Sequence, residues 1–217
     1  DNVLMAKKLD AAQTEASKSG AACDVILELN LSCPHGMGER GMGLACGQKA
    51  DMVRNICKWV AEVAKVPFFA KMTPNVTDVT EISLAAKEGG ATGVTAVNTI
   101  SGLMGLKSNG EPWPGVGKDK LTTYGGMSGN ANRPVAMRAV SAICNRIPGF
   151  PVMATGGADT GSNSMNFLQV GAGLVQICSA VQNQDFCVVQ DYILAMKTQL
   201  YMRSRPDLKL WNEQQPP

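Results

Sequence analysis

Short apolar segments alternate with longer amphipathic segments along most of the chain. Apolar and β-branched residues concentrate in five short segments, which predict strands over residues 24–30, 67–72, 93–98, 151–155 and 174–178. The spacing of apolar residues elsewhere predicts helices over residues 2–19, 51–64, 77–90, 133–146, 162–170 and 186–200. Because the strands are almost continuously apolar, we expect a parallel sheet that is covered on both faces.

The sequence also predicts the ends of one helix, the buried face of another and two long loops. Thr77 or Asp78 is expected to cap the helix over residues 77–90, and Gly89 followed by Gly90 should end it. The helix over residues 51–64 is expected to bury one apolar face, made of Met52, Val53, Ile56, Trp59 and Val60. Residues 31–48 and 99–132 are predicted to be long loops.

The strand–helix alternation fits two α/β architectures, a doubly wound sheet or a (β/α) barrel. Polar residues or glycines stand at the C-terminal end of almost every predicted strand: Asn30, Lys71, Asn98, Gly156 with Gly157, and Ser179. In a barrel these ends meet at one mouth, which is where active sites lie. A (β/α)8 TIM barrel needs eight strands. We therefore expect an incomplete barrel with about five of its eight βα units, within a larger protein.

The domain boundaries follow from the same pattern. Residues 1–203 are expected to form the C-terminal part of the barrel. Residues 204–217 are polar and end in two prolines, so they are expected to be a tail or a linker toward a following domain.

Composition and charge exclude several classes of function. The 217 residues carry a net charge of +2, too close to neutral for binding nucleic acid or an anionic membrane. No apolar run is long enough to cross a bilayer. The single histidine excludes mechanisms that need two, and the seven cysteines include no C-x-x-C motif for a zinc ribbon or an iron–sulfur cluster. The N-terminal residues are not a signal peptide, so we expect reduced thiols and a cytoplasmic location.

The loop that follows residue 30 is the strongest candidate for chemistry. It holds five glycines between residues 31 and 48, together with Cys33. Cys33 could be a nucleophile activated by His35, or could bind zinc with His35 and Cys46. It could instead be a general acid, because an unperturbed thiol has a pKa of about 8.5 and keeps its proton at neutral pH. Asn30 and Ser32 could form hydrogen bonds with a polar heterocycle.

The sequence Asn-Leu-Ser-Cys-Pro-His-Gly-Met-Gly-Glu-Arg-Gly-Met-Gly-Leu-Ala-Cys-Gly-Gln, residues 30–48, closely resembles the catalytic loop of the dihydropyrimidine dehydrogenases. The resemblance continues in one register through residues 68–75, 98–106, 123–129, 154–157 and 178–186. The dihydroorotate dehydrogenases share only the shorter Asn-x-Ser-Cys-Pro core. The extended glycine loop and Gln-Asn-Gln-Asp-Phe at residues 182–186 favour the pyrimidine reductases.

The resemblance implies a barrel of the dihydroorotate dehydrogenase type that binds FMN. It implies that Lys71 contacts the flavin ring, although a lysine at a strand end could also extend to water. The other residues implied to line FMN are Gly129, Thr155, Gly156, Gly157, Cys178 and Ser179. The residues implied to bind substrate are Asn30, Leu31, Ser32, Asn98 and Thr99. Bare glycine amides suit a phosphate, and a buried ammonium needs an anionic or strongly polar partner.

The implied reaction is reduction of the 5,6 double bond of uracil or thymine, the first step of pyrimidine catabolism. FMN would supply the hydride and Cys33 the proton. NADPH, FAD and 4Fe-4S clusters would belong to other domains of a homodimeric parent, so we expect the isolated chain to be inactive. Two alternatives stay open: a dihydroorotate-type reductase, which would need a cation such as Arg40 for the substrate carboxylate, and a non-catalytic half barrel.

Overall fold

Five parallel strands form the central sheet of the computed structural model, which describes residues 2–20, 24–32, 44–121 and 125–205. The strands are β1 (Leu27–Asn30), β2 (Phe68–Met72), β3 (Gly93–Ala96), β8 (Val152–Thr155) and β9 (Leu174–Gln176). They pair in the order β1-β2-β3-β8-β9, and every pair is parallel. The predicted strands and their parallel arrangement are therefore confirmed, with each strand shorter than predicted.

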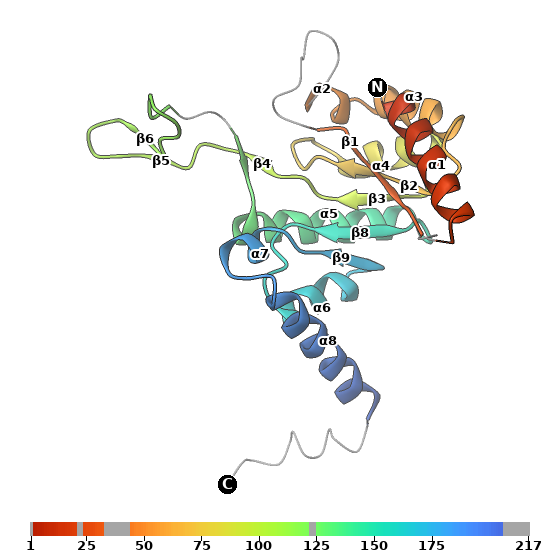
Figure 1. The fold of residues 1–217 in the computed structure, drawn as a ribbon. Coiled ribbons are helices and arrows are strands. Elements are labelled where there is room, and N and C mark those ends of the chain that lie inside the picture. Colours follow the sequence, from red (N-terminus) through yellow and green to blue (C-terminus); the bar gives the residue numbers. More distant parts are fainter. Residues whose placement is uncertain (1, 21–23, 33–43, 122–124, 206–217) are drawn as a thin grey trace.

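Helices follow the strands along the chain (Figure 1). The longer ones are α1 (Asn2–Lys18), α3 (Ala50–Ala61), α4 (Val79–Glu88), α5 (Arg133–Arg146), α6 (Gly161–Gln169) and α8 (Val188–Ser204). As predicted, Asp78 caps α4 through a hydrogen bond from the Thr80 amide, and Gly89 ends it. None of the helices that the structure describes is both long and apolar enough to cross a membrane.

One face of the sheet packs against helices and forms the core. Leu29, Ala70, Val94 and Val152 stand side by side across β1, β2, β3 and β8 and are all buried. They share one apolar cluster with helix residues Val53, Val60, Ile82, Ala86, Val140, Ile143 and Phe167. A doubly wound sheet would carry helices on both faces. The chain therefore has the α/β architecture of an incomplete (β/α)8 barrel, and its sheet does not close within the described residues.

The opposite face of the sheet is polar near its centre. Residues in β1 and β8 alternate between buried and more exposed positions. Glu28, Lys71, Thr95 and Gln176 stand on this second face. The expectation that both faces of the sheet are covered therefore holds for β3, whose four residues are all buried, but not for β1, β8 and β9, because the inner side of a barrel sheet holds the groups that serve its mouth.

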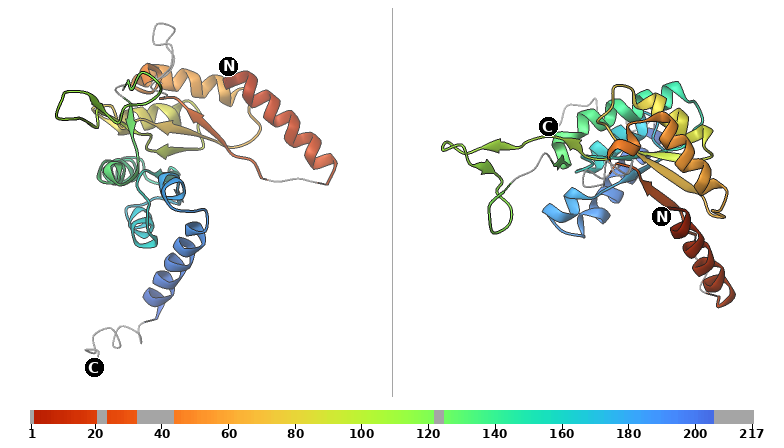
Figure 2. Two further views of the ribbon diagram at one scale, coloured as in Figure 1. Left: turned by 60° about the vertical axis from the view of Figure 1, so that its left-hand side comes forward. Right: turned by 90° about the horizontal axis from the view of Figure 1, so that it is seen from above.

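Several local expectations also differ from the structure. Trp59 is 54% exposed, because Val53, Cys57 and Val60 form the buried stripe of α3 and Trp59 projects sideways from it. The predicted loop over residues 99–132 contains two antiparallel pairs, β4 (Ile100–Ser101) with β7 (Gly126–Met127) and β5 (Gly105–Leu106) with β6 (Pro112–Trp113). These short strands form an arm that extends away from the sheet (Figures 1 and 2).

Three short helices were not predicted. They are α2 (Leu44–Gly47), the 3-10 turn η2 (Gly129–Asn132) and α7 (Ser179–Asn183). Each is five residues or fewer, which is too short for a periodic pattern of apolar residues. Ser179 begins α7 shortly after β9, with Ile177 and Cys178 between them, and α2 lies within a segment predicted to be a loop.

Candidate functional site

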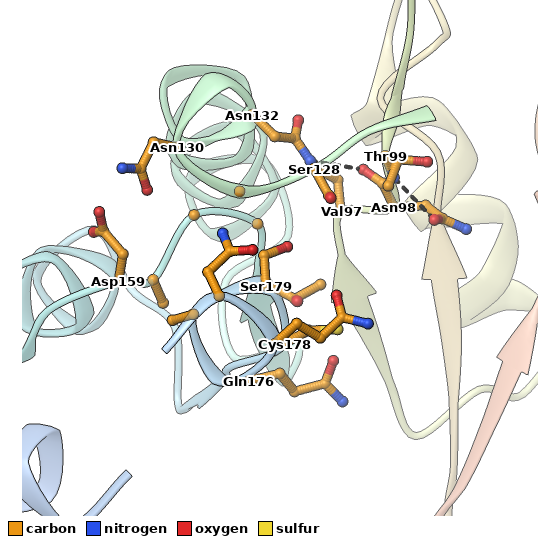
Figure 3. A pocket seen from close by; sticks show the side chains of 18 of the residues that line it. Val97, Asn98, Thr99, Ser128, Asn130, Asn132, Asp159, Gln176, Cys178 and Ser179 are labelled. Carbon is orange, nitrogen blue, oxygen red and sulfur yellow. Dashed lines mark hydrogen bonds between the residues drawn. The ribbon is translucent and has the colours of Figure 1, made fainter. Parts of the chain in front are cut away.

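A cavity of about 610 Å³ opens at the carboxyl ends of β2, β3, β8 and β9 (Figure 3). Nine predicted site residues line it: Lys71, Asn98, Thr99, Gly129, Thr155, Gly156, Gly157, Cys178 and Ser179. Its volume lies within the range of about 300–1,000 Å³ that is typical of small-molecule sites. The clustering follows from the parallel sheet, which places all its carboxyl ends at one edge.

Lys71 has the anionic partner that its position at a strand end predicts. Its Nζ lies 2.9 Å from Oε1 of Glu28, and the two side chains are only 23% and 29% exposed. Glu28 Oε2 also accepts hydrogen bonds from Thr95 Oγ1 at 2.9 Å and from Gln176 Nε2 at 2.8 Å. Burial raises the pKa of Glu28, but the hydrogen bonds from Lys71, Gln176 and Thr95 outweigh burial and leave that pKa below its usual value. Glu28 is therefore ionised beside the lysine.

Two consecutive glycines form a bare backbone wall on the far side of the cavity. Gly156 and Gly157 have φ angles of 117° and 81°, which side chains rarely tolerate. A Cβ on Gly157 would lie 2.6 Å from Cβ of Arg133 and 2.8 Å from the carbonyl oxygen of Gly129. The chain therefore excludes side chains here and brings main-chain atoms up to the cavity, which fits a phosphate-binding wall.

Asp159 contributes a carboxylate to the same wall (Figure 3). Its Oδ1 accepts from Arg133 Nη1 at 2.8 Å and from Asn163 Nδ2 at 2.6 Å. Burial raises the pKa of Asp159, and the Asn163 hydrogen bond together with the Arg133 charge lowers it further than burial raises it. Because Arg133 compensates this charge, the wall remains compatible with an anionic ligand.

Amide and hydroxyl groups form the opposite side of the site, where β1 and β3 end. Asn98 Nδ2 donates to Asn30 Oδ1 at 3.1 Å and to Ser32 Oγ at 2.8 Å. Asn98 Oδ1 accepts from the Thr99 amide at 2.8 Å. Four of the five predicted substrate-binding residues therefore meet in one network. The fifth, Leu31, is 3% exposed and packs into the core, so its side chain does not face the cavity.

The catalytic candidate Cys33 lies outside the described residues, as do His35 and Arg40. Cys46, the third member of the alternative zinc set, is buried, and burial raises the pKa of its thiol. Within the described part of the chain, no three histidine, cysteine or acidic side chains cluster as metal ligands would. Cys178 differs from the buried cysteines because it is exposed and lines the cavity (Figure 3).

Several polar residues of the site were missed from the sequence, Asp159 among them. Glu28 had a usable signal, since a charge in the middle of a buried strand requires a partner. Gln176 is an uncharged residue at the end of β9 and carries no such signal, because its bond to Glu28 spans 148 positions. Asn132 is 1% exposed, donates through Nδ2 to the Asn98 carbonyl at 3.0 Å, and leaves its buried Oδ1 without a partner. An orphaned acceptor beside the cavity is consistent with a ligand that donates to it.

Comparison with known proteins gives a consistent result. Residues 5–200 match the protein family described as dihydroorotate dehydrogenase. The chain is 36% identical over 177 residues to the chloroplastic dihydropyrimidine dehydrogenase (NADP(+)) of Arabidopsis thaliana, covering 79% of this chain and 41% of the relative. It is 41% identical over 154 residues to the catalytic subunit of dihydroorotate dehydrogenase B (NAD(+)) of Methanocella arvoryzae, covering 71% and 48%.

A bacterial relative shows the same partial coverage. Over 176 residues the chain is 34% identical to subunit PreA of the NAD-dependent dihydropyrimidine dehydrogenase of Escherichia coli K12, covering 79% of this chain and 41% of the relative. The chain thus spans about half, or less, of the length of these three relatives.

Proposed function

Because the chain belongs to the dihydroorotate dehydrogenase family, whose members in general bind FMN, we propose that it forms the FMN- and pyrimidine-binding part of an oxidoreductase that reduces the 5,6 double bond of uracil or thymine. The observation that carries the proposal is the single cavity that joins Lys71, the Gly156–Gly157 wall and the amides of Asn98 and Thr99.

The residues around the cavity fit FMN. The Gly156–Gly157 wall, with Gly129 and Ser179 beside it, would hold the phosphate through main-chain and hydroxyl groups. Lys71 stands across the cavity, where its charge would lie near the flavin ring. When bound, FMN supplies the hydride.

The amide network suits a planar pyrimidine. A pyrimidine edge alternates carbonyl acceptors with N–H donors, and each asparagine amide offers one donor and one acceptor. Asn98 and Asn30 lie within hydrogen-bond distance of each other, so their side-chain amides are close enough to address one ring. At the same strand ends, Ser32 adds a hydroxyl group and Thr99 a main-chain amide, both of them hydrogen-bonded to the Asn98 side chain.

Charge supports a neutral substrate over a carboxylate-bearing one. Among the described residues that line the cavity, Lys71 is the single cation, and its ion pair with Glu28 already offsets part of its charge. Orotate would bring a carboxylate that needs a free cation. Reduction of orotate or oxidation of dihydroorotate is the second candidate, favoured by the 41% identity to the dihydroorotate dehydrogenase B subunit.

We assign Cys33 as the proton donor. The Cys33 sulfhydryl would give its proton to C5 of the pyrimidine, while C6 receives the hydride, so that one hydrogen adds to each carbon of the double bond. The resulting thiolate would recover a proton from water. Electron supply from NADPH, through FAD and 4Fe-4S clusters in other domains of a homodimer, completes the proposal.

The proposal is tested on the full-length, flavin-loaded protein. The flavin is reduced with dithionite without oxygen and then mixed with uracil or with orotate, and its reoxidation is followed by absorbance. Uracil should reoxidise the flavin at least a hundredfold faster than orotate. The variant Cys33→Ala should still bind uracil but lose reoxidation by several orders of magnitude, whereas Cys33→Ser should retain slow turnover.

Each other outcome has a definite meaning. Faster reoxidation by orotate would favour the second candidate. A protein without flavin absorbance would support the non-catalytic half barrel, and a fully active Cys33→Ala variant would remove the acid role.

A further inference from the structure

Glu28 connects its own strand to three others on the polar face of the sheet. It lies in β1, and its carboxylate accepts from Lys71 in β2, Thr95 in β3 and Gln176 in β9. Lys71 and Thr95 are direct neighbours in the sheet register, so their side chains stand together beside Glu28. Gln176 approaches from the strand at the other end of the sheet order. The carboxylate is therefore held from several directions.

The hydrogen bonds divide between the two carboxylate oxygens. Oε1 accepts from the Lys71 ammonium, and Oε2 accepts from Thr95 and Gln176. Thr95 is fully buried, so the carboxylate is fixed on a rigid part of the sheet. A fixed carboxylate determines where a flexible lysine side chain places its ammonium.

Lys71 and Gln176 both line the cavity, so the hydrogen bonds around Glu28 extend from the polar face of the sheet to the cavity. The Lys71 ammonium thus stands between the Glu28 carboxylate and whatever occupies the cavity. The positive charge of Lys71 therefore attracts both the Glu28 carboxylate and the occupant of the cavity. A ligand that gains negative charge in the cavity competes with Glu28 for this ammonium.

We propose that Glu28 is a positioning residue that holds the Lys71 ammonium at the cavity and, by neutralising part of its charge, lowers the reduction potential of the bound flavin. The inference rests on the proposed function, because it takes FMN to be the ligand. Reduction adds negative charge to the flavin, and a neighbouring positive charge favours it. Removing the Glu28 charge leaves Lys71 uncompensated and therefore favours the reduced form.

The test measures the flavin reduction potential of the full-length, flavin-loaded protein by anaerobic dye-coupled titration. Glu28→Gln keeps the size of the side chain and removes its charge. It should shift the reduction equilibrium at least tenfold toward the reduced form, which is about 30 mV to more positive potential for a two-electron couple. Lys71→Gln should shift the potential in the opposite direction.

Thr95→Val is the matched control. It removes one donor to Glu28 with little change in side-chain volume and leaves both charges in place. It should lower the melting temperature while moving the potential by much less than Glu28→Gln does. Equal shifts in Thr95→Val and Glu28→Gln would mean that the network only holds the sheet together, and would overturn the proposal.

The remaining outcomes separate this inference from the proposed function. If the wild-type protein binds flavin and Glu28→Gln leaves the potential unchanged, the inference fails alone. If the wild-type protein binds no flavin, the proposed function fails and the inference fails with it. If Glu28→Gln does not fold, Glu28→Asp replaces it: its carboxylate is one methylene further from Lys71, and a smaller shift of the same sign is expected, with no shift overturning the proposal.

Discussion

The side-chain amide of Asn98 donates a hydrogen bond of 2.8 Å to the hydroxyl oxygen of Ser32, although 66 positions separate the two residues. The bond joins the chain just after β3 to the chain just after β1. The side chain of Asn132 also holds the Asn98 main chain, because its Nδ2 donates to the carbonyl oxygen of Asn98. The polar groups of the proposed pyrimidine site are thus oriented before any ligand arrives. Such preorganisation reduces the entropy lost on binding.

The first prediction concerns the side chain of Asn98. Asn98→Ala should weaken uracil binding at least tenfold, because a hydrogen bond contributes about 1 kcal/mol or more and about 1.4 kcal/mol is a factor of ten. Asn132 still holds the main chain, so the fold should persist. The dissociation constant is measured by calorimetry. Asn145→Ala, at an exposed position near the end of α5, is the control and should bind uracil normally. Equal affinity in both variants would exclude Asn98 from the pyrimidine site.

The second prediction separates backbone strain from loss of the glycine wall. Gly157 and Gly149 have similar φ angles, 81° and 76°, but an added Cβ meets Arg133 and Gly129 at Gly157 and open space at Gly149. Alanine at either position should cost about 1–2 kcal/mol of unfolding free energy because of the left-handed backbone. Gly157→Ala should lose a further 1–3 kcal/mol, roughly, from overpacking.

Only Gly157→Ala should also lose bound FMN. The measurements are urea unfolding and the ratio of flavin absorbance to protein. Flavin content that falls equally in Gly149→Ala would show that general instability, and not the wall, causes the loss.

The fold was predictable where its signals are local. Asp78 caps the start of α4 and Gly89 its end, each through hydrogen bonds within a few positions, and Pro134 stands in the first turn of α5, a position that tolerates proline. The clustering of Lys71 and Asn98 was also predictable, because parallel strands bring their carboxyl ends to one edge. These conclusions require only the order of strands and helices.

The polar face of the sheet was not predictable in the same way. The partners of Glu28 depend on which strands are neighbours and on the curvature that brings Gln176 near β1. No local pattern contains this information. The orphaned oxygen of Asn132 and the sideways position of Trp59 likewise depend on tertiary packing, which overrides residue type.

The third prediction uses two cysteines that are both exposed. Cys178 lines the cavity, whereas Cys187 lies just before α8 and does not. Saturating FMN should slow alkylation of Cys178 by iodoacetamide at least tenfold and leave Cys187 unchanged. Burial raises the pKa of Cys57 to about 12, so Cys57 should react only after unfolding. Mass spectrometry of the time course measures each site, and equal rates at Cys178 with and without FMN would contradict its placement beside the flavin.

The last prediction concerns the cap of α4. Asp78 Oδ1 accepts from the hydroxyl and the amide of Thr80, at 2.7 and 2.8 Å, and these hydrogen bonds lower the pKa of Asp78. A lowered pKa in the folded state means that the carboxylate stabilises the fold above its ordinary pKa, and that this contribution is lost as the pH falls through the lower, folded value. Asp78→Ala should therefore cost about 1 kcal/mol at pH 7, with a smaller difference from wild type in strong acid.

Two further variants separate the cap from the charge. Asp78→Asn keeps an acceptor for the Thr80 amide, so it should cost less than Asp78→Ala and show less change with pH below 5, roughly. Asp119→Ala, at an exposed position in the arm, should stay within about 0.5 kcal/mol of wild type. Urea unfolding at several pH values measures all three variants. A cost for Asp78→Ala that is the same at every pH would show that the ionised carboxylate contributes nothing beyond the shape of the cap.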